Sequence, residues 1–223
     1  APMQPFIDWK KQEGYNVIVA PTSLTGTTAT SIKTYMQSLW TAATPENPAP
    51  SYLLIVGDVA QVPTNNGTTS SHPTDLNYVR LQGTDYMPEM YFGRFSATTV
   101  AEVTNQVNKT LMYEQYTMPS DAYLSEVVMI AGVDSYYGSS HANGQINYGT
   151  NNYFNTAHNI TSHTYLYPSS GSSESAIVQN LSSGVGYANY TAHGDVTYWY
   201  DPNITISNVN SLQNTNKYSF VVG

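Results

Sequence analysis

The stretch YANYTAHGDVTYW, residues 187–199, sets an apolar and aromatic run against a short polar cluster. The run has the composition of a strand, and it ends at His193, which Gly194 follows at once. One interpretation is an inert histidine, hydrogen-bonded at the end of a strand. The rest of the sequence decides between that interpretation and a chemical role for His193.

Segments typical of strands alternate with segments typical of helices along the whole chain. Such alternation predicts βαβ units, and hence an α/β fold with a mostly parallel sheet and helices on both faces. A polar segment at 117–125 predicts a boundary between two subdomains, 1–119 and 120–223. The strand-like segments are YNVIVAP (15–21), SYLLIVGD (51–58), EVVMIAGVD (126–134), HTYLYP (163–168), GYANYTAHG (186–194) and KYSFVVG (217–223). The helix-like segments are 5–14, 30–43, a long one with its apolar stripe from Val100 to Leu111, 147–158 and 172–184.

The composition excludes several classes of partner. The 223 residues carry a formal net charge of −8 with only seven Lys and Arg, which argues against nucleic acid and anionic membrane surfaces. No apolar run reaches the roughly 18 residues of a membrane span. The sequence has no cysteine, so it contains neither disulfides nor a zinc–thiolate site. Few charges among much Asn, Thr, Ser and Tyr favour a secreted protein over a cytoplasmic enzyme.

Polar residues stand where the predicted strands end. Asp58, Asp134 and His193 each follow an apolar run. In open α/β sheets ligands bind outside the carboxyl ends of the strands, so Asp134 and His193 are expected to meet at one crevice. A histidine held by a carboxylate is suited to take a proton from a nucleophile and to return it to a leaving amine. No Gly-x-Ser-x-Gly elbow presents a serine, and the next strand end follows Gly223, so the site lacks an evident nucleophile.

Two further groups of residues have spacings that suit metal ions. His158 and His163 are close in sequence, but no third ligand stands near them, and exposed loop histidines are the simpler interpretation. Asp85 and Glu89 flank a proline-containing loop, with Asp58 available from a strand end. Their oxygens suit calcium, although on spacing alone an ordinary acidic turn is the simpler interpretation.

Five segments, in order along the chain, resemble the gingipain cysteine peptidases, and among them the lysine-specific type. These segments are DYMPEMYFGRFSA (85–97), LMYEQYTMP (111–119), YLSEVVMIAGVD (123–134), ANYTAHG (188–194) and NKYSFVVG (216–223). The resemblance implies a caspase-like α/β domain of two subdomains, secreted by bacteria, that hydrolyses peptide bonds through a cysteine thiolate. It implies catalytic roles for His193 as acid and base and for Asp134 as the carboxylate that orients it.

The resemblance also assigns binding roles. Thr191 matches a residue that lines the pocket for the substrate's P1 side chain, and Tyr137 stands where the family has a pocket tryptophan. A structural calcium ion would be held by Asp58, Asp85, the Met87 carbonyl and Glu89, although Gly83 replaces one acid of the relative. No organic cofactor is expected. A preference for lysine at P1 is only suggested, because the acidic residue that selects lysine matches no position here.

In that family the strand matching KYSFVVG is followed by Asn and then by cysteines, one of them the nucleophile, and an apolar strand precedes the first helix. The chain is therefore expected to be incomplete at both ends and inactive without a second segment or chain. Our hypothesis is a secreted or cell-surface cysteine endopeptidase acting on proteins or peptides, with Gly194 N–H in the oxyanion hole. The alternatives are a non-catalytic pseudopeptidase that serves as a calcium-stabilised binding module, and a serine-type hydrolase.

Overall fold

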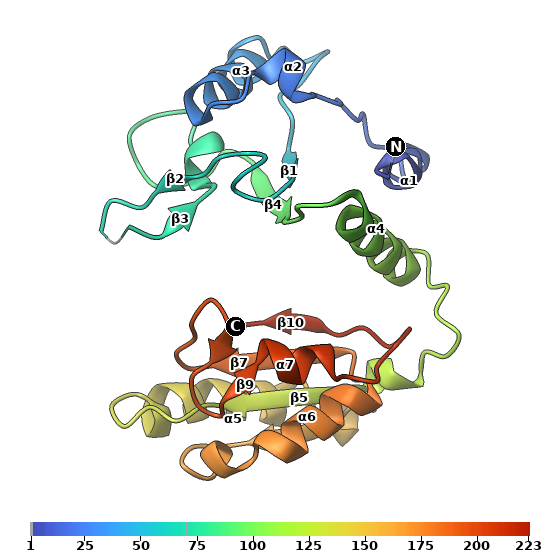
Figure 1. Ribbon diagram of the computed structural model, residues 1–223, viewed down its shortest axis with the longest axis vertical. Coiled ribbons are helices and arrows are strands. Elements are labelled where there is room, and N and C mark those ends of the chain that lie inside the picture. The colour runs from blue at the N-terminus through green and yellow to red at the C-terminus, as the bar shows by residue number, and fades with distance from the viewer. Residues whose placement is uncertain (1, 70) are drawn as a thin grey trace. The chain divides into compact units, whose positions relative to one another are not determined.

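The computed structural model describes residues 2–69 and 71–223 (Figure 1). The chain forms two compact units, residues 1–115 and 116–223. Each unit contains its own parallel strands and its own hydrophobic core. None of the helices in the described residues is both long enough and apolar enough to cross a membrane.

The first unit is built around one pair of parallel strands. Strands β1 (Tyr52–Val56) and β4 (Tyr91–Phe95) pair in register, with Tyr52 opposite Tyr91 and Val56 opposite Phe95. The other elements of this unit are α1 (Gln4–Gln12), α2 (Thr22–Thr25), α3 (Ala29–Thr41), the short hairpin strands β2 (Asn65–Asn66) and β3 (Pro73–Thr74), a 3-10 turn at Leu76–Tyr78, and α4 (Val100–Glu114).

Helices cover both faces of this strand pair. Ile32 and Met36 of α3 pack with Ile55 of β1, while Val103 and Val107 of α4 belong to a separate cluster that Phe6 of α1 joins. Thr28 and Thr99 begin α3 and α4, each with a reciprocal capping box. Gly14, at φ 96°, follows α1 in a left-handed conformation that favours glycine, which explains why the helix ends there.

One expectation for the first unit was wrong, and one of its strands was not predicted. Residues 15–21 were predicted to form a strand, but the structure pairs them with no neighbour, and Ile18 and Val19 are exposed. A strand requires a partner for its backbone groups, so an apolar run alone does not create one. Conversely, β4 arises within the segment 85–97, which was not predicted as a strand.

The second unit has a four-stranded parallel sheet in the order β10-β7-β5-β6. Its strands are β5 (Glu126–Ala131), β6 (Thr161–Tyr165), β7 (Tyr187–Thr191) and β10 (Phe220–Val222). Between them lie a π-helical turn (Gly138–Ala142), α5 (Asn143–Asn152), α6 (Glu174–Ser183), the small hairpin β8 (Tyr198–Trp199) and β9 (Ile204–Thr205), and α7 (Ile206–Asn210). Short 3-10 turns lie at Ala122–Ser125, Thr156–His158 and Ser169–Ser172.

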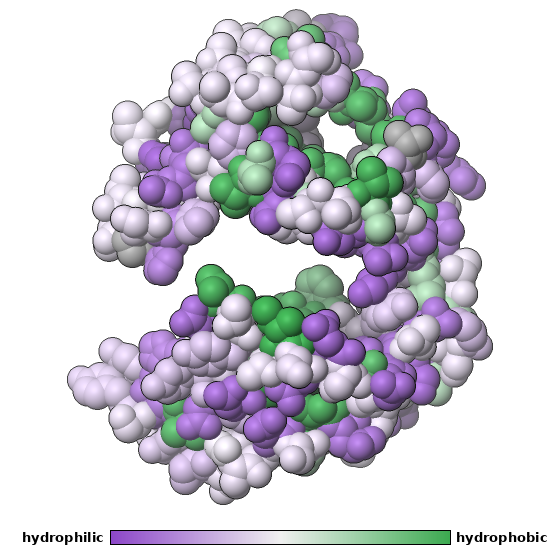
Figure 2. Space-filling view, in the orientation of Figure 1, coloured by the Kyte–Doolittle hydropathy of each residue, from purple (hydrophilic) through white to green (hydrophobic). Residues whose placement is uncertain are grey.

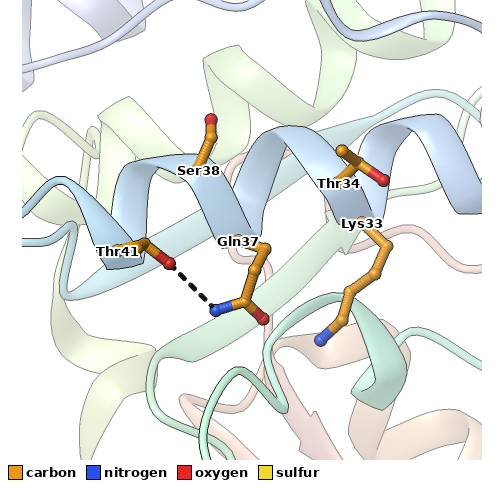
Figure 3. Close-up of a pocket in the computed structure, with 5 residues that line it drawn as sticks. All are labelled: Lys33, Thr34, Gln37, Ser38 and Thr41. Atoms are coloured by element: carbon orange, nitrogen blue, oxygen red, sulfur yellow. Dashed lines mark hydrogen bonds between the residues drawn. The ribbon is translucent and has the colours of Figure 1, made fainter.

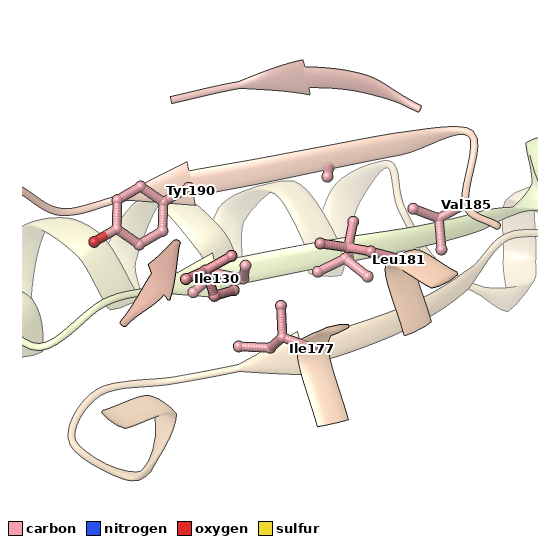
Figure 4. Close-up of a cluster of buried hydrophobic side chains, with 8 residues drawn as sticks. Ile130, Ile177, Leu181, Val185 and Tyr190 are labelled. Carbon is pink, nitrogen blue, oxygen red and sulfur yellow. The ribbon is translucent and has the colours of Figure 1, made fainter. Parts of the chain in front are cut away.

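Each face of this sheet carries a helix. On one face Ile177 and Leu181 of α6 pack against Ile130 of β5 and Tyr190 of β7 (Figure 4). On the other face Ile146 of α5 packs with buried side chains of β5. This arrangement confirms the predicted α/β class with a mostly parallel sheet and helices on both faces. The helix predicted at 147–158 lies earlier, because the π-helical turn runs directly into α5.

Strand β10 lies at one edge of the sheet and pairs only with β7 among the described residues. Phe220, Val221 and Val222 are all exposed, and hydrophobic side chains reach the surface along this strand (Figure 2). An apolar edge strand of this kind has unpaired backbone groups on its outer side.

A largely buried arginine joins three segments of the first unit. Arg94 of β4 donates to both carboxylate oxygens of Asp75 at 2.6 and 2.8 Å. It also donates to the carbonyls of Gly57 and Val62 at 2.6 and 3.0 Å. Its side chain is only 12% exposed, so these contacts are shielded from water. Arg94 therefore fixes the loop that follows β1, which carries Asp58.

Replacing this arginine is expected to destabilise the first unit. Arg94→Ala leaves the Asp75 carboxylate unpaired, and we expect the free energy of unfolding to fall by about 3 kcal/mol. Arg94→Lys should recover only part of the loss, because an ammonium group cannot reproduce the planar bidentate contact. Urea denaturation followed by circular dichroism measures both variants. Lys10→Ala, which breaks a more exposed pair with Glu114, is the control and should cost less than about 1 kcal/mol. An Arg94→Lys variant as stable as the parent chain would contradict this role.

Candidate active site

The register of two central strands brings Asp134 and His193 to the same edge of the sheet. Ala131 at the end of β5 is paired with Thr191 at the end of β7. Asp134 and His193 follow these ends within three residues, so the two side chains leave neighbouring strands at nearly the same level. The His193 Nε2 atom lies 3.0 Å from Asp134 Oδ2. The structure thus brings together the two residues that strand ends alone had indicated.

Asp134 is held by its own backbone turn. Its Oδ1 atom accepts hydrogen bonds from the Tyr136 and Tyr137 amides at 2.8 and 2.9 Å. These two hydrogen bonds keep the pKa of the Asp134 carboxyl below its usual value, and the bond from Tyr137 has the larger effect. The nearby His193 lowers this pKa further. The side chain is only 14% exposed. Asp134 is therefore a fixed anion whose second oxygen faces the imidazole.

His193 is oriented but accessible. Its side chain is 76% exposed, while Nε2 faces the carboxylate. A carboxylate can only accept, so in the neutral imidazole the proton is assigned to Nε2 and Nδ1 carries the free lone pair. The pair can therefore take a proton at Nδ1 from a group that approaches from solvent, and Asp134 would stabilise the resulting imidazolium.

The backbone after His193 folds back on itself. The His193 carbonyl accepts from the Tyr200 amide at 2.9 Å and from the Tyr190 hydroxyl at 2.7 Å. Gly194 forms an antiparallel bridge with Trp199, and the Asp195 amide donates to the Tyr198 carbonyl. Because a trans peptide points its C=O and N–H in opposite directions, the Gly194 N–H points away from Tyr190 and Tyr200. Gly194 is exposed, so this amide is available to a ligand.

The two residues assigned to substrate binding lie in different surroundings. Thr191 ends β7, where its hydroxyl accepts from the side-chain Nδ2 of Asn189 at 2.8 Å and donates to the side-chain Oε1 of Gln145 at 3.3 Å. Tyr137 is 51% exposed, and its ring contacts those of Tyr136 and His141 edge-on. Tyr137 also supplies one of the amides that hold Asp134, a role that its sequence position did not reveal. Both assignments to the substrate pocket stay predictions from the resemblance.

The three acidic residues expected to bind calcium each accept hydrogen bonds from other groups. Asp58 accepts from the Val59 amide and the Ser96 hydroxyl, which lower the pKa of its carboxyl. Asp85 Oδ1 accepts from the Met87 amide, and Glu89 accepts from the Leu81 amide. Across residues 2–69 and 71–223, no group of three or more His, Asp or Glu side chains is placed to hold a metal. The present arrangement does not fit an ion, and calcium stays a prediction from the resemblance alone.

The other two candidate histidines have separate partners. His163 lies on β6 rather than in a loop, and its Nε2 atom is 2.8 Å from Glu126. His158 Nδ1 lies 3.1 Å from the Asn155 side chain, with which it shares a tight turn. The interpretation as exposed loop histidines therefore fits His158, which is exposed in a 3-10 turn, but it is wrong for His163, which is partly buried on a strand.

Two surface depressions lie outside this pair of residues. One follows α3 in the first unit and is lined by Lys33, Thr34, Gln37, Ser38 and Thr41, with Gln37 donating to Thr41 (Figure 3). The other, in the second unit, includes Glu126, His163 and Lys217. Neither depression contains Asp134 or His193. The candidate site is therefore identified by the contact between these two side chains and not by a cavity.

Sequence reasoning missed the residues that support the pair. A side chain at Gly132 would place its Cβ 2.4 Å from the Ala192 Cβ and from the Asp201 carbonyl, so only glycine allows these segments to approach. Tyr190 is buried and stacked on Trp199. The apolar and aromatic run that begins at Tyr187 predicted a strand, but nothing in it indicated a tyrosine hydroxyl directed at the backbone of His193.

Comparison with known proteins identifies the family of this chain. The model of peptidase family C25 matches residues 1–223. Lys-gingipain HG66 from Porphyromonas gingivalis is 38% identical over 223 residues, which cover 99% of this chain and 13% of that protein. Gingipain R2 from strain ATCC BAA-308 / W83 of the same species is 27% identical over 225 residues, covering 98% of this chain and 29% of that protein.

Solved structures share the fold. A structure described as that of a protease aligns with a TM-score of 0.89 and 36% identity, covering 100% of this chain and 49% of its own. The crystal structure of the Arg specific cysteine proteinase gingipain R shows the fold alone, with a TM-score of 0.77, 23% identity, and coverage of 98% and 50%. The chain thus spans about half of these solved chains and a smaller share of the curated relatives. The caspase-like α/β fold and the resemblance noted in the sequence are confirmed, and this chain belongs to peptidase family C25.

Proposed function

We propose that this chain carries the acid–base pair of a secreted cysteine endopeptidase, with its thiol on the segment that follows Gly223. The observation that carries the proposal is the 3.0 Å contact between His193 Nε2 and Asp134 Oδ2. A merely structural ion pair would not need an imidazole that is 76% exposed with one nitrogen free. The exposed Nδ1 is what a general base requires, because its proton donor must reach it.

The register of β10 supports a thiol close to His193. Val222 is paired with Asn189 of β7, and the strands are parallel. A chain that kept this register would place the third residue after Gly223 beside His193. The family resemblance expects Asn and then cysteines at this point. A parallel strand running alongside β7 would thus deliver a nucleophile to the same edge where the acid–base pair stands.

The proposed reaction assigns one task to each group. His193 takes the thiol proton at Nδ1, and the thiolate attacks the scissile carbonyl to form a tetrahedral oxyanion. The exposed Gly194 amide would donate to that oxygen, together with the amide of the nucleophile. His193 then returns the proton to the leaving amine, which yields the acyl-enzyme, and finally activates the water that hydrolyses it. Asp134 orients the imidazole in every step and stabilises it while it carries the extra proton.

Substrate class and location follow from the resemblance and remain part of the proposal. Thr191 and Tyr137 would line the pocket for the P1 side chain, with a preference for lysine. Proteins or peptides would be the substrates, and the enzyme would act outside the cell or at its surface. The rest of the catalytic domain would come from a further segment or a second chain. Calcium takes no part in this reaction, and its binding at Asp58, Asp85, Met87 and Glu89 rests on the resemblance.

Removing the base is expected to abolish turnover without unfolding the protein. In the complete catalytic domain, His193→Ala should lower kcat/KM for peptide substrates by about 10⁴-fold, because the thiol loses its base. The melting temperature should hardly change, since the imidazole is exposed. His163→Ala, which breaks another histidine–carboxylate contact of the same unit, is the matched control and should retain activity. Full turnover by His193→Ala would refute the proposed function.

The carboxylate is tested separately by Asp134→Asn. The asparagine oxygen can still accept from the Tyr136 and Tyr137 amides, so the turn is kept. Its amide nitrogen would donate to Nε2 and force the imidazole proton to Nδ1, which removes the base. We expect kcat to fall by about 10² to 10⁴-fold with little change in stability. Steady-state kinetics and thermal unfolding measure the two effects, and an active Asp134→Asn enzyme would contradict the orienting role.

The pH dependence of stability follows from the sign of the Asp134 shift. A carboxyl whose pKa is lowered by folding stabilises the protein above its unfolded pKa, and this contribution is lost as pH falls through the folded value. Asp58 and Glu102 are shifted in the same direction by hydrogen bonds to their carboxylates. These groups should therefore leave the melting temperature unchanged near neutral pH. Below about pH 4, where they become protonated, the melting temperature should fall. Asp134→Asn should reduce that fall, and an unchanged acid profile would contradict this account.

A further inference from the structure

The carbonyl of His193 is held by a side chain from the hydrophobic core. Tyr190 is only 4% exposed and packs with Ile130, Ile177 and Leu181. Its ring stacks on Trp199 with the centroids 4.3 Å apart and the planes inclined by 4°. In Figure 4 the ring lies beside the end of β7, and its hydroxyl points away from the cluster of apolar side chains. A ring fixed in this way has little freedom to move its hydroxyl.

The Tyr190 hydroxyl stands where three backbone segments meet. It donates to the His193 carbonyl at 2.7 Å, accepts from the Asp201 amide at 3.4 Å, and lies 3.5 Å from the Asp201 carbonyl. The Asp201 carbonyl in turn accepts from Val133, the residue before Asp134. Burial raises the pKa of Tyr190, so the hydroxyl keeps its proton and remains a donor at neutral pH.

We infer that Tyr190 is a positioning residue of the active site, acting through the peptide group between His193 and Gly194. This peptide is planar, so a hydrogen bond that fixes its carbonyl also fixes the direction of the Gly194 N–H. The same bond anchors the backbone from which the exposed imidazole projects toward Asp134. One buried hydroxyl therefore aligns the base and the proposed oxyanion donor together.

The inference rests on the proposed function, because it assumes that His193 and Gly194 act in catalysis. Its distinctive claim concerns the hydroxyl and not the ring. Tyr190→Phe keeps the stacking on Trp199 and the packing against Ile130, and it removes the donor to the His193 carbonyl together with the longer contacts to Asp201. The Tyr200 amide would still contact that carbonyl, so the loop should stay folded with a looser peptide plane.

The test is the steady-state kinetics of Tyr190→Phe in the complete catalytic domain. We expect kcat to fall by about 10- to 100-fold, because small displacements of reacting groups have effects of this size. KM should stay within about twofold, since no proposed contact with substrate is removed. Replacement of Tyr190 by 4-aminophenylalanine, which restores a donor at the same position, should recover most of kcat. Unchanged kcat in Tyr190→Phe would overturn the inference.

A matched variant separates positioning from stability. The Tyr165 hydroxyl accepts from the Asn180 side chain at 2.6 Å in the same unit, and burial raises the pKa of this tyrosine as well. Tyr165→Phe should lower the melting temperature by a few degrees, about as much as Tyr190→Phe, while kcat stays within about twofold. An equal loss of kcat in Tyr165→Phe would overturn the inference. Parallel assay of His193→Ala separates the two hypotheses, since activity retained there refutes the proposed function itself.

Discussion

The parallel pairing of β5 with β7 is the constraint on which the candidate site depends. Five residue pairs, from Val127 with Tyr187 to Ala131 with Thr191, align the two strands. Buried side chains on both faces lock this alignment, because a shift by one residue would turn each apolar side chain toward the wrong face. Asp134 and His193 continue from these strands, so their separation is set by the same register.

Beyond the last strand pairs, the geometry is maintained by close packing and hydrogen bonds. Gly132 lets β5 approach the segments at Ala192 and Asp201, and Val133 then donates to the Asp201 carbonyl. The turn at Asp134 is closed by its own carboxylate. The loop that follows His193 returns to place Trp199 on a core tyrosine. These contacts hold the few residues that follow the strands. They therefore fix the side chains of Asp134 and His193, which lie just beyond β5 and β7.

The sequence allowed the fold class and the proximity of Asp134 to His193 to be predicted, because both depend on local patterns. Apolar runs with a polar residue at the end predict buried strands, and parallel topology brings such ends together. Contacts between residues far apart in the chain could not be predicted from the sequence. Residues 15–21 have the pattern of a strand but find no neighbour among the described residues, and the hairpin of β8 and β9 is too short to give a periodic signal.

The same distinction separates the two predicted sites. Asp134 and His193 lie at the ends of paired strands, so the sheet brings them within 3.0 Å. Asp85 and Glu89 lie in irregular backbone between Tyr78 and β4, where no register fixes their separation, and nearby amides bind their carboxylates. Arg80, whose side chain donates to the Thr84 and Asp85 carbonyls, adds a positive charge to that loop. The sequence therefore predicts which side chains meet where regular structure sets their separation, and does so poorly where irregular backbone sets it.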